Sequence, residues 1–281
     1  MNILLQESEI STVSARFEER MVQDGYVHFK NIISPDLSRL IKKNIHDALV
    51  ALGAQQNDSF NQQYMTLIKT IPPYEVNVAI RRHLIFSQIP HKILLIPDIF
   101  NFLLQLLGPD LAYLAECELP VNLKDVTNFR LVKKFHQEFW SGAGYRSYVL
   151  WTPLIFPEGS GGLEIIKGSH LWGHIPHRNR EPVFMPEDAE QHTIDSSNCS
   201  DRDILIFHSL TLHRTIPNPI DSARLAYATH VRNIFESDSG FEMLKNWEIF
   251  HLSPTSRIMR ACGNPHLSPF RTYGGSVSTQ Y

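Results

Sequence analysis

The feature that most constrains the fold is a series of short apolar segments in the second half of the chain. Turns rich in glycine, proline and serine separate these segments. Short strands at such spacing are typical of an all-β barrel or a double-sheet jelly roll. We therefore predict that the chain becomes mainly β from about residue 111. The segments cover residues 129–132, 148–151, 163–166, 204–207 and 225–231.

The first third of the chain has the pattern of α-helices. Ser34 is a candidate N-cap before Pro35, apolar residues then repeat at helical spacing, and Gly53 can end the helix. A second amphipathic helix is expected over residues 97–107, where a Gly-Pro pair follows. Apolar and polar residues alternate over residues 26–33, which predicts a strand before the first helix.

We expect the whole chain to form a single domain. The polar stretch 178–201 is expected to be a long loop of the kind that often covers a barrel mouth. The end of the chain after Ser253 is rich in Ser, Pro, Gly and Arg, which is typical of a lid or a disordered tail. The expected parts of the domain, residues 1–281, are a helical region at about 1–110, a β core at about 111–235 and a tail at about 236–281.

The composition argues against several classes of protein. A formal net charge of -3 gives no basic excess of the kind that nucleic-acid binding requires, and no apolar run is long enough to span a bilayer. Cys117, Cys199 and Cys262 lie far apart in the sequence, which favours neither a disulfide framework nor a zinc finger and fits a reducing compartment. The N-terminus lacks the pattern of a signal peptide, so we expect a cytoplasmic protein. The sequence carries no signal for an oligomeric state.

One motif in the β region can bind a metal ion. His136 and Glu138 are two residues apart, so both side chains lie on one face of an extended strand. His213 follows the apolar segment 204–207, where a barrel can return it to the first pair. Two imidazoles and one carboxylate form the facial triad that holds non-haem Fe(II) and leaves positions open, although zinc accepts the same ligands. His208 is the alternative third ligand, but its place at the end of an apolar strand favours a structural role.

Arg224 follows His213 after eleven residues (213 to 224) and narrows the choice of chemistry. It opens the last apolar segment, where an inward-pointing arginine is costly unless it meets an anion. The planar guanidinium binds a carboxylate through two parallel hydrogen bonds. A dicarboxylate held by the metal at one end and by Arg224 at the other satisfies both groups, and 2-oxoglutarate is such a molecule.

These residues belong to an ordered set that resembles the phytanoyl-CoA dioxygenase (PhyH) family of Fe(II)/2-oxoglutarate-dependent oxygenases. The likeness is densest between residues 128 and 232, and the pattern over residues 24–35 also resembles the opening strand and helix of the family. Each single piece is common, whereas the complete order is specific. The matching positions are His136-Gln137-Glu138, Trp151, the glycine-rich stretch 161–170, the stretch 203–208, and His213, Thr215, Asn218 and Arg224.

The resemblance implies a mainly β fold, with a double-stranded β-helix (jelly-roll, cupin-like) core and N-terminal helices. It implies Fe(II) on His136, Glu138 and His213, with 2-oxoglutarate and O2 as co-substrates. The implied activity is hydroxylation of a small molecule at a C–H bond, with succinate and CO2 as co-products. Each of three residues also has a simpler interpretation when it is taken alone. Thr215 can be an ordinary strand residue, Trp151 can belong to the core, and Gln137 can face the solvent. The contacts implied for 2-oxoglutarate are Arg224, Thr215, Gln137 and Trp151.

Several alternatives share this pattern. The same cofactors drive desaturation, epimerisation or cyclisation in natural-product biosynthesis. Retention of Glu138 argues against a halogenase, because halogenases of this family vacate that position for halide. Glutamate in place of the commoner aspartate at residue 138, together with Lys167 and the Arg214-Thr215 pair at positions where the family differs, argues against transferring an acyl-CoA substrate. A rival of another class is a non-catalytic metal- or ligand-binding barrel, and a cupin-type isomerase or zinc hydrolase is a further alternative.

Two other groups of residues are expected near the active site. The spacing of three histidines resembles a helix, but intervening glycine and proline residues favour a loop near the barrel mouth over a second metal site; these are His170, His174 and His177. Four further side chains are candidates for substrate contact, with ordinary packing or surface charge as the alternative for each: Trp140, Tyr145, Arg146 and Arg232.

Overall fold

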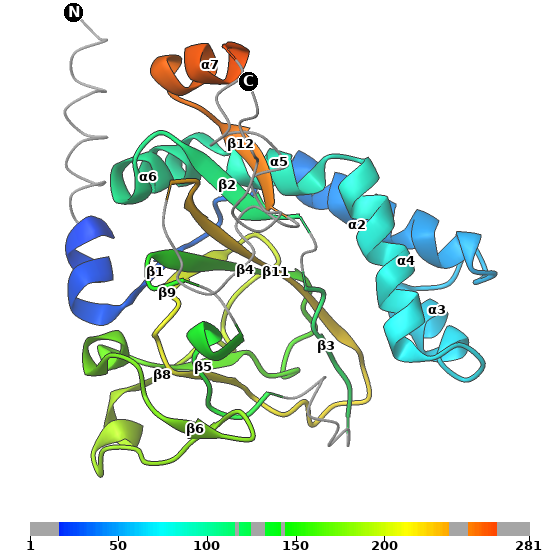
Figure 1. Ribbon diagram of the computed structural model, residues 1–281. Coiled ribbons are helices and arrows are strands. Elements are labelled where there is room, and N and C mark those ends of the chain that lie inside the picture. The colour runs from blue at the N-terminus through cyan, green and yellow to red at the C-terminus, as the bar shows by residue number, and fades with distance from the viewer. Residues whose placement is uncertain (1–16, 116–117, 125–132, 142–143, 236–246, 263–281) are drawn as a thin grey trace, which may run out of the picture.

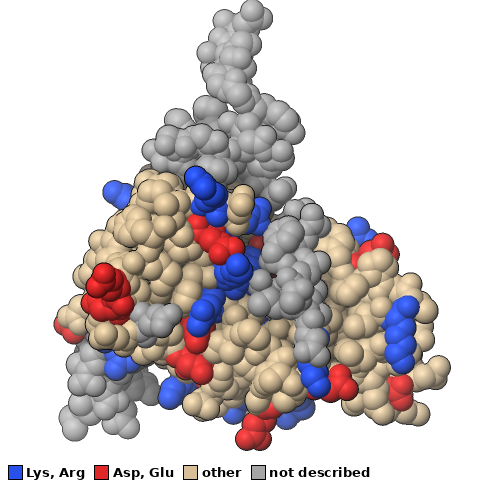
Figure 2. All heavy atoms as spheres, turned by 90° about the horizontal axis from the view of Figure 1, so that it is seen from below, with Lys and Arg blue, Asp and Glu red and all other residues tan. Residues whose placement is uncertain are grey.

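The computed structural model describes residues 17–115, 118–124, 133–141, 144–235 and 247–262. In this part of the chain a layer of helices packs on one face of a large antiparallel sheet, and a smaller sheet packs on the other face (Figure 1). On the face shown in Figure 2, basic and acidic side chains are interspersed. None of the helices in these ranges combines the length and the apolar character needed to cross a membrane.

The helical layer follows residues 17–24, which are also helical. The Ser34 hydroxyl caps α2 (Pro35–Ala51) as predicted, since it accepts a hydrogen bond of 3.2 Å from the Leu37 amide. Helix α6 (Pro97–Leu107) has the predicted bounds and ends at Gly108, whose φ is 77°. Between them lie α3 (Phe60–Leu67), α4 (Pro73–Phe86) and α5 (Ile89–Leu94).

The large sheet is antiparallel and contains strands from both ends of the described chain. The predicted strand 26–33 is shorter than expected, because it ends at Phe29 and the chain turns before α2. The predicted segment 129–132 lies outside the described residues. The order is β1 (Tyr26–Phe29), β9 (Ile204–His208), β4 (Ser147–Ile155), β11 (Arg224–Asn233), β2 (Leu111–Leu114) and β12 (Trp247–His251), with β3 (Val121–Asn122) paired to β11.

The central strands are apolar without interruption because both of their faces are buried. In β9, Ile204 and Ile206 pack against the helical layer, whereas Leu205 and Phe207 face the smaller sheet. Successive side chains of a strand point to opposite faces, so a continuous apolar run serves both layers. The space between the two sheets is where the candidate site lies.

The smaller sheet corrects two expectations about irregular segments. The stretch 178–201 is not one long loop, because β8 (Thr193–Asp195) within it pairs with β5 (Leu163–Ile166) and a hairpin forms at its start. The end of the chain after Ser253 continues as helix α7 (Pro254–Ala261), and the expected lid or tail beyond residue 262 lies outside the described residues. The remaining elements are β10 (His213–Thr215), β5 (Leu163–Ile166), β8 (Thr193–Asp195), β6 (His177–Arg178), β7 (Glu181–Pro182) and the 3₁₀ helices η1 (Glu138–Ser141), η2 (Ser169–Trp172) and η3 (Ala189–His192). The predicted jelly-roll core with N-terminal helices is confirmed.

Shortening Ile206 should destabilise the interface between the helices and the sheet. Its side chain is fully buried there, and removing such a side chain leaves a cavity that costs about 2–5 kcal/mol. We expect Ile206→Ala to lower the free energy of unfolding in urea by this amount and Ile206→Val by about 0.5–1.5 kcal/mol. Equal stability of Ile206→Ala and the wild type would contradict this packing.

Candidate metal and co-substrate site

Two histidines that are distant in the sequence lie opposite each other in a short antiparallel bridge. His136 donates its amide to the His213 carbonyl at 3.0 Å, and the reverse bond measures 3.2 Å. Directly opposed residues place their side chains on the same face, and the two ring centroids are 4.2 Å apart. This pairing explains how residue 213 reaches the site, which the sequence predicted without specifying the contact.

Each of these rings is oriented by a backbone carbonyl group two residues earlier in the chain. The Nδ1 atom of His136 lies 2.7 Å from the Lys134 carbonyl oxygen, and that of His213 lies 2.9 Å from the Thr211 carbonyl oxygen. A carbonyl only accepts, so Nδ1 carries the hydrogen in both rings and Nε2 keeps its lone pair. Both lone pairs therefore point toward the cavity, which is the arrangement of metal-binding histidines.

Glu138 completes the cluster from an unexpected element. It begins the 3₁₀ helix η1 and does not lie on a strand with His136, because regular pairing ends after the bridge. Its Oε1 atom is 3.2 Å from Nε2 of His136 and 3.4 Å from Nε2 of His213. The three ligand atoms lie within 4.8 Å of one another, and all three residues are buried. Two imidazoles and one carboxylate on one side of an open cavity suit an Fe(II) or zinc ion.

Charge around the cluster is balanced by a lysine that the sequence analysis missed. Lys133 Nζ lies 2.7 Å from Glu118 and 3.6 Å from Glu138. Burial favours a raised pKa for Glu138, but the Lys133 charge holds that pKa well below its usual value. Burial and the neighbouring His136 lower the pKa of His213 to about 4. At neutral pH the site therefore offers an ionised carboxylate and a neutral His213 imidazole, the protonation states that metal binding requires.

Arg224 lies at the other end of the same cavity and is 1% exposed. Its Nη1 donates to the carbonyl oxygens of Gly161 and Gly162 at 3.0 and 2.8 Å. A Cβ at Gly162 would come within 2.6 Å of the Ser196 backbone, so glycine is required for this close approach. The buried Nε atom of Arg224 has no hydrogen-bond partner among the described residues. An unpaired guanidinium nitrogen beside a cavity is the feature expected of an anion site.

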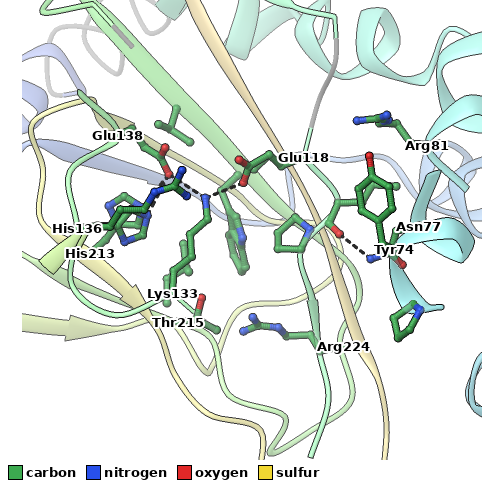
Figure 3. Close-up of a pocket in the computed structure, with 18 of the residues that line it drawn as sticks. Tyr74, Asn77, Arg81, Glu118, Lys133, His136, Glu138, His213, Thr215 and Arg224 are labelled. Carbon is green, nitrogen blue, oxygen red and sulfur yellow. Dashed lines mark hydrogen bonds and ion pairs between the residues drawn. The ribbon is translucent and has the colours of Figure 1, made fainter. Parts of the chain in front are cut away.

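The cavity has a volume of about 730 Å³ and joins the histidine cluster to Arg224. Figure 3 shows His136, Glu138 and His213 on one side, with Thr215 and Arg224 below them. Thr215 reaches the cavity because it follows His213 by two residues on β10 and shares its face. Trp151 also lines the cavity and packs in the apolar cluster between the sheets. Thr215, Trp151 and Arg224 are therefore placed where a bound co-substrate can contact them.

Gln137 requires a correction, because its side chain is not part of this cavity. Its Nε2 donates to the carbonyl oxygens of Gly173 and Leu210, and its Oε1 accepts from the Ile175 amide. Both amide hydrogens are thus used by the backbone, and the residue is fully buried. Gln137 therefore connects the segment before η1 to neighbouring loops through hydrogen bonds. Its side chain is available neither for contact with a co-substrate nor for exposure to solvent.

The remaining candidates lie away from the cavity. His208 accepts a hydrogen bond from the Leu210 amide and is outside the metal-ligand cluster. Trp140 donates to the Ile175 carbonyl and stacks on His177, so both serve packing. The other residues named for the cavity mouth or for substrate contact do not line the cavity either: His170, His174, Tyr145, Arg146 and Arg232.

Besides Lys133, two further groups of residues around the site were not predicted from the sequence. The first is the wall formed by helix α4, from which Tyr74, Asn77 and Arg81 reach the cavity opposite the triad (Figure 3). The second is His230, whose Nε2 lies 3.8 Å from Glu138. His230 is six residues after Arg224 on β11, so the period of two along that strand was a usable signal. No sequence pattern pointed to α4, because its approach depends on tertiary packing.

Comparison with known proteins agrees with this geometry. Residues 123–226 match the family model of phytanoyl-CoA dioxygenase (PhyH), and this segment contains the triad and Arg224. A structure described as the apo non-haem monooxygenase ThoJ has a similar fold, with a TM-score of 0.59, 21% identity and 84% coverage of each chain. The epimerase SnoN, in complex with Fe3+, alpha-ketoglutarate and nogalamycin RO, has a TM-score of 0.55 at 15% identity, over 86% of this chain and 96% of that chain.

At these identities the two solved structures establish a common fold. The match to the family model is a likeness in sequence, and it covers the segment that carries the candidate ligands. The resemblance seen in the sequence is confirmed: residues 123–226 are similar to the PhyH family, and the fold is shared with a non-haem monooxygenase.

Proposed function

We propose that this chain is an Fe(II)- and 2-oxoglutarate-dependent dioxygenase that hydroxylates a small molecule at a C–H bond. The observation that carries the proposal is one cavity with a His-Glu-His cluster at one end and a buried, partly unpaired arginine at the other. A metal ion fits the donor set, and an anionic group fits the arginine. 2-Oxoglutarate combines a metal-chelating end with a distant carboxylate, so it matches both ends of the cavity.

In this proposal the residues of the chain have distinct roles. His136, Glu138 and His213 hold Fe(II), which together with 2-oxoglutarate and O2 supplies the oxidising chemistry and leaves succinate and CO2 as co-products. Lys133 offsets the charge of Glu138. The distal carboxylate of 2-oxoglutarate is bound by Arg224 and by the Thr215 hydroxyl. The apolar wall around Trp151 excludes water, which strengthens these charged contacts.

The space beyond the co-substrate is assigned to the substrate. The cavity extends to Tyr74, Asn77 and Arg81 of α4, on the side opposite the triad (Figure 3). Its volume of about 730 Å³ exceeds what a five-carbon dicarboxylate occupies and accommodates a small molecule as well. We therefore place substrate recognition on the helical layer, and the reacting C–H bond between α4 and the triad.

Epimerisation is the second candidate outcome, with desaturation and cyclisation as variants of the same chemistry. It is favoured by the shared fold with SnoN, which is described as an epimerase. All of these reactions use the same metal and co-substrate, so the residues above keep their roles. Product analysis separates them, because only hydroxylation adds an oxygen atom to the substrate. The rival non-catalytic barrel accounts for the metal cluster but leaves the buried Arg224 nitrogen without a partner.

Removing a ligand of the triad should abolish co-substrate turnover. With Fe(II), 2-oxoglutarate and ascorbate, we expect slow succinate formation by the wild type even without substrate, and none by His136→Ala or His213→Ala. The matched control is His192→Ala, which removes an exposed histidine outside the cavity and should keep the wild-type rate. Succinate formation that persists in both triad variants would exclude the proposed metal site.

Replacing Arg224 should weaken 2-oxoglutarate binding while metal binding is retained. Hydrogen bonds to charged groups contribute about 1.5–3 kcal/mol, so we expect the KM for 2-oxoglutarate to rise roughly 10- to 100-fold in Arg224→Gln. Arg214→Gln is the matched control, because Arg214 is on the opposite face of its strand and pairs with Glu164. An unchanged KM in Arg224→Gln, measured by succinate release, would contradict the assigned role.

A further inference from the structure

A second cluster of potential metal ligands lies at the edge of the large sheet. His28 is on β1, Asp203 directly precedes β9, and Cys199 is in the segment between β8 and β9. The ligand atoms of these three residues lie within 4.8 Å of one another. His28 is separated by 171 residues from Cys199 and by 175 from Asp203. The spacing of the cysteines therefore could not indicate this cluster, and pairing of β1 with β9 creates it.

The contacts of His28 distinguish between possible roles for the cluster. Its Nε2 atom is 2.8 Å from Oδ2 of Asp203 and 3.6 Å from Sγ of Cys199. In a Cys-His-Asp catalytic triad the nucleophile and the acid contact opposite ring nitrogens, so this geometry excludes that role. A hydrogen bond from Nε2 to the carboxylate accounts for only part of the cluster, because Nε2 then has no lone pair left to accept from the thiol. A cation between the three atoms satisfies all of them.

The distance between the cysteine sulfur and the histidine nitrogen agrees with the coordination geometry of zinc. Bond lengths of about 2.3 Å to sulfur and 2.0 Å to nitrogen, at tetrahedral angles, place S and N about 3.5 Å apart. The observed Sγ–Nε2 distance is 3.6 Å. The Nε2–Oδ2 distance of 2.8 Å would have to widen by about half an ångström on binding. Such a change is within reach of the His28 side chain, which is 23% exposed.

The surroundings also support a ligand role for Asp203. Its Oδ1 atom accepts hydrogen bonds of 2.8 Å from the Asn31 amide and the Ser200 hydroxyl, so Oδ2 is directed at the cluster. Carboxylate ligands of metal sites are commonly fixed by outer hydrogen bonds of this kind. A thiolate and a carboxylate carry two negative charges, which a divalent cation cancels in this partly buried place.

We propose that His28, Cys199 and Asp203 bind a divalent transition-metal ion, with zinc favoured by the thiolate and imidazole ligands and a fourth position open to water. This site is separate from the His136-Glu138-His213 triad. The ion would join the edge strand β1 to the segment that leads into β9.

Cobalt substitution tests the site in the full chain. The triad contains no thiol, so a near-ultraviolet thiolate-to-cobalt charge-transfer band reports only on a cysteine ligand. With Co(II) added anaerobically, we expect this band in the wild type and in His136→Ala, and its loss in Cys199→Ser. Cys117→Ser and Cys262→Ser are the matched controls and should keep the band.

The result can overturn the proposal without reference to any enzymatic activity. A wild-type protein saturated with Co(II) that shows no thiolate band excludes the site, and so does a band that persists in Cys199→Ser. If Cys199→Ser does not fold, thermal unfolding of His136→Ala provides the second measurement. Added Zn2+ should raise its Tm, and His28→Gln in the same background should abolish the rise. An equal rise in both variants would contradict the assignment.

Discussion

The candidate site depends on the backbone bridge between His136 and His213. Two reciprocal hydrogen bonds set these residues directly opposite each other, and each Nδ1 atom is held by a carbonyl two residues away. The ligand nitrogens are therefore positioned by the main chain before any ion binds. Glu138 reaches the same point through the turn into η1, so the carboxylate does not need to be on the strand. This rigid arrangement is what a metal centre with open positions requires.

The second constraint is the burial of charge between two packed sheets. Glu138 is tolerated because Lys133 and the histidines surround it, and Lys133 is in turn paired with Glu118. Arg224 is held by two carbonyl oxygens but keeps an unpaired nitrogen at the cavity. The triad end of the cavity therefore favours a cation, and the arginine end favours an anion. One chelating dicarboxylate together with a metal ion meets both.

Much of this fold was predictable from local patterns. The cap at Ser34, the bounds of α6 and the apolar runs of β4, β5, β9 and β11 follow from residue preferences and spacing. The stretch 178–201 was wrongly expected to be a loop, because short pairing of β5 with β8 leaves little trace in composition.

The contacts of individual side chains were harder to predict than the positions of the helices and strands. Gln137 was expected at the co-substrate, yet its amide is used by three backbone groups that only the folded chain brings together. Lys133 and the α4 wall were missed for the same reason. Equally, the contact of His28 with Cys199 and Asp203 depends on strand pairing over more than 170 residues and has no local signature.

The central claim is that the triad and Arg224 together bind Fe(II) and 2-oxoglutarate in one cavity. Anaerobic absorption spectroscopy tests this most directly, because Fe(II) chelated by 2-oxoglutarate absorbs visible light and neither component alone does so. We predict that adding 2-oxoglutarate to the Fe(II)-loaded protein produces this band, with one co-substrate bound per chain at saturation. A protein that binds Fe(II) but develops no visible band on addition of 2-oxoglutarate would contradict the account.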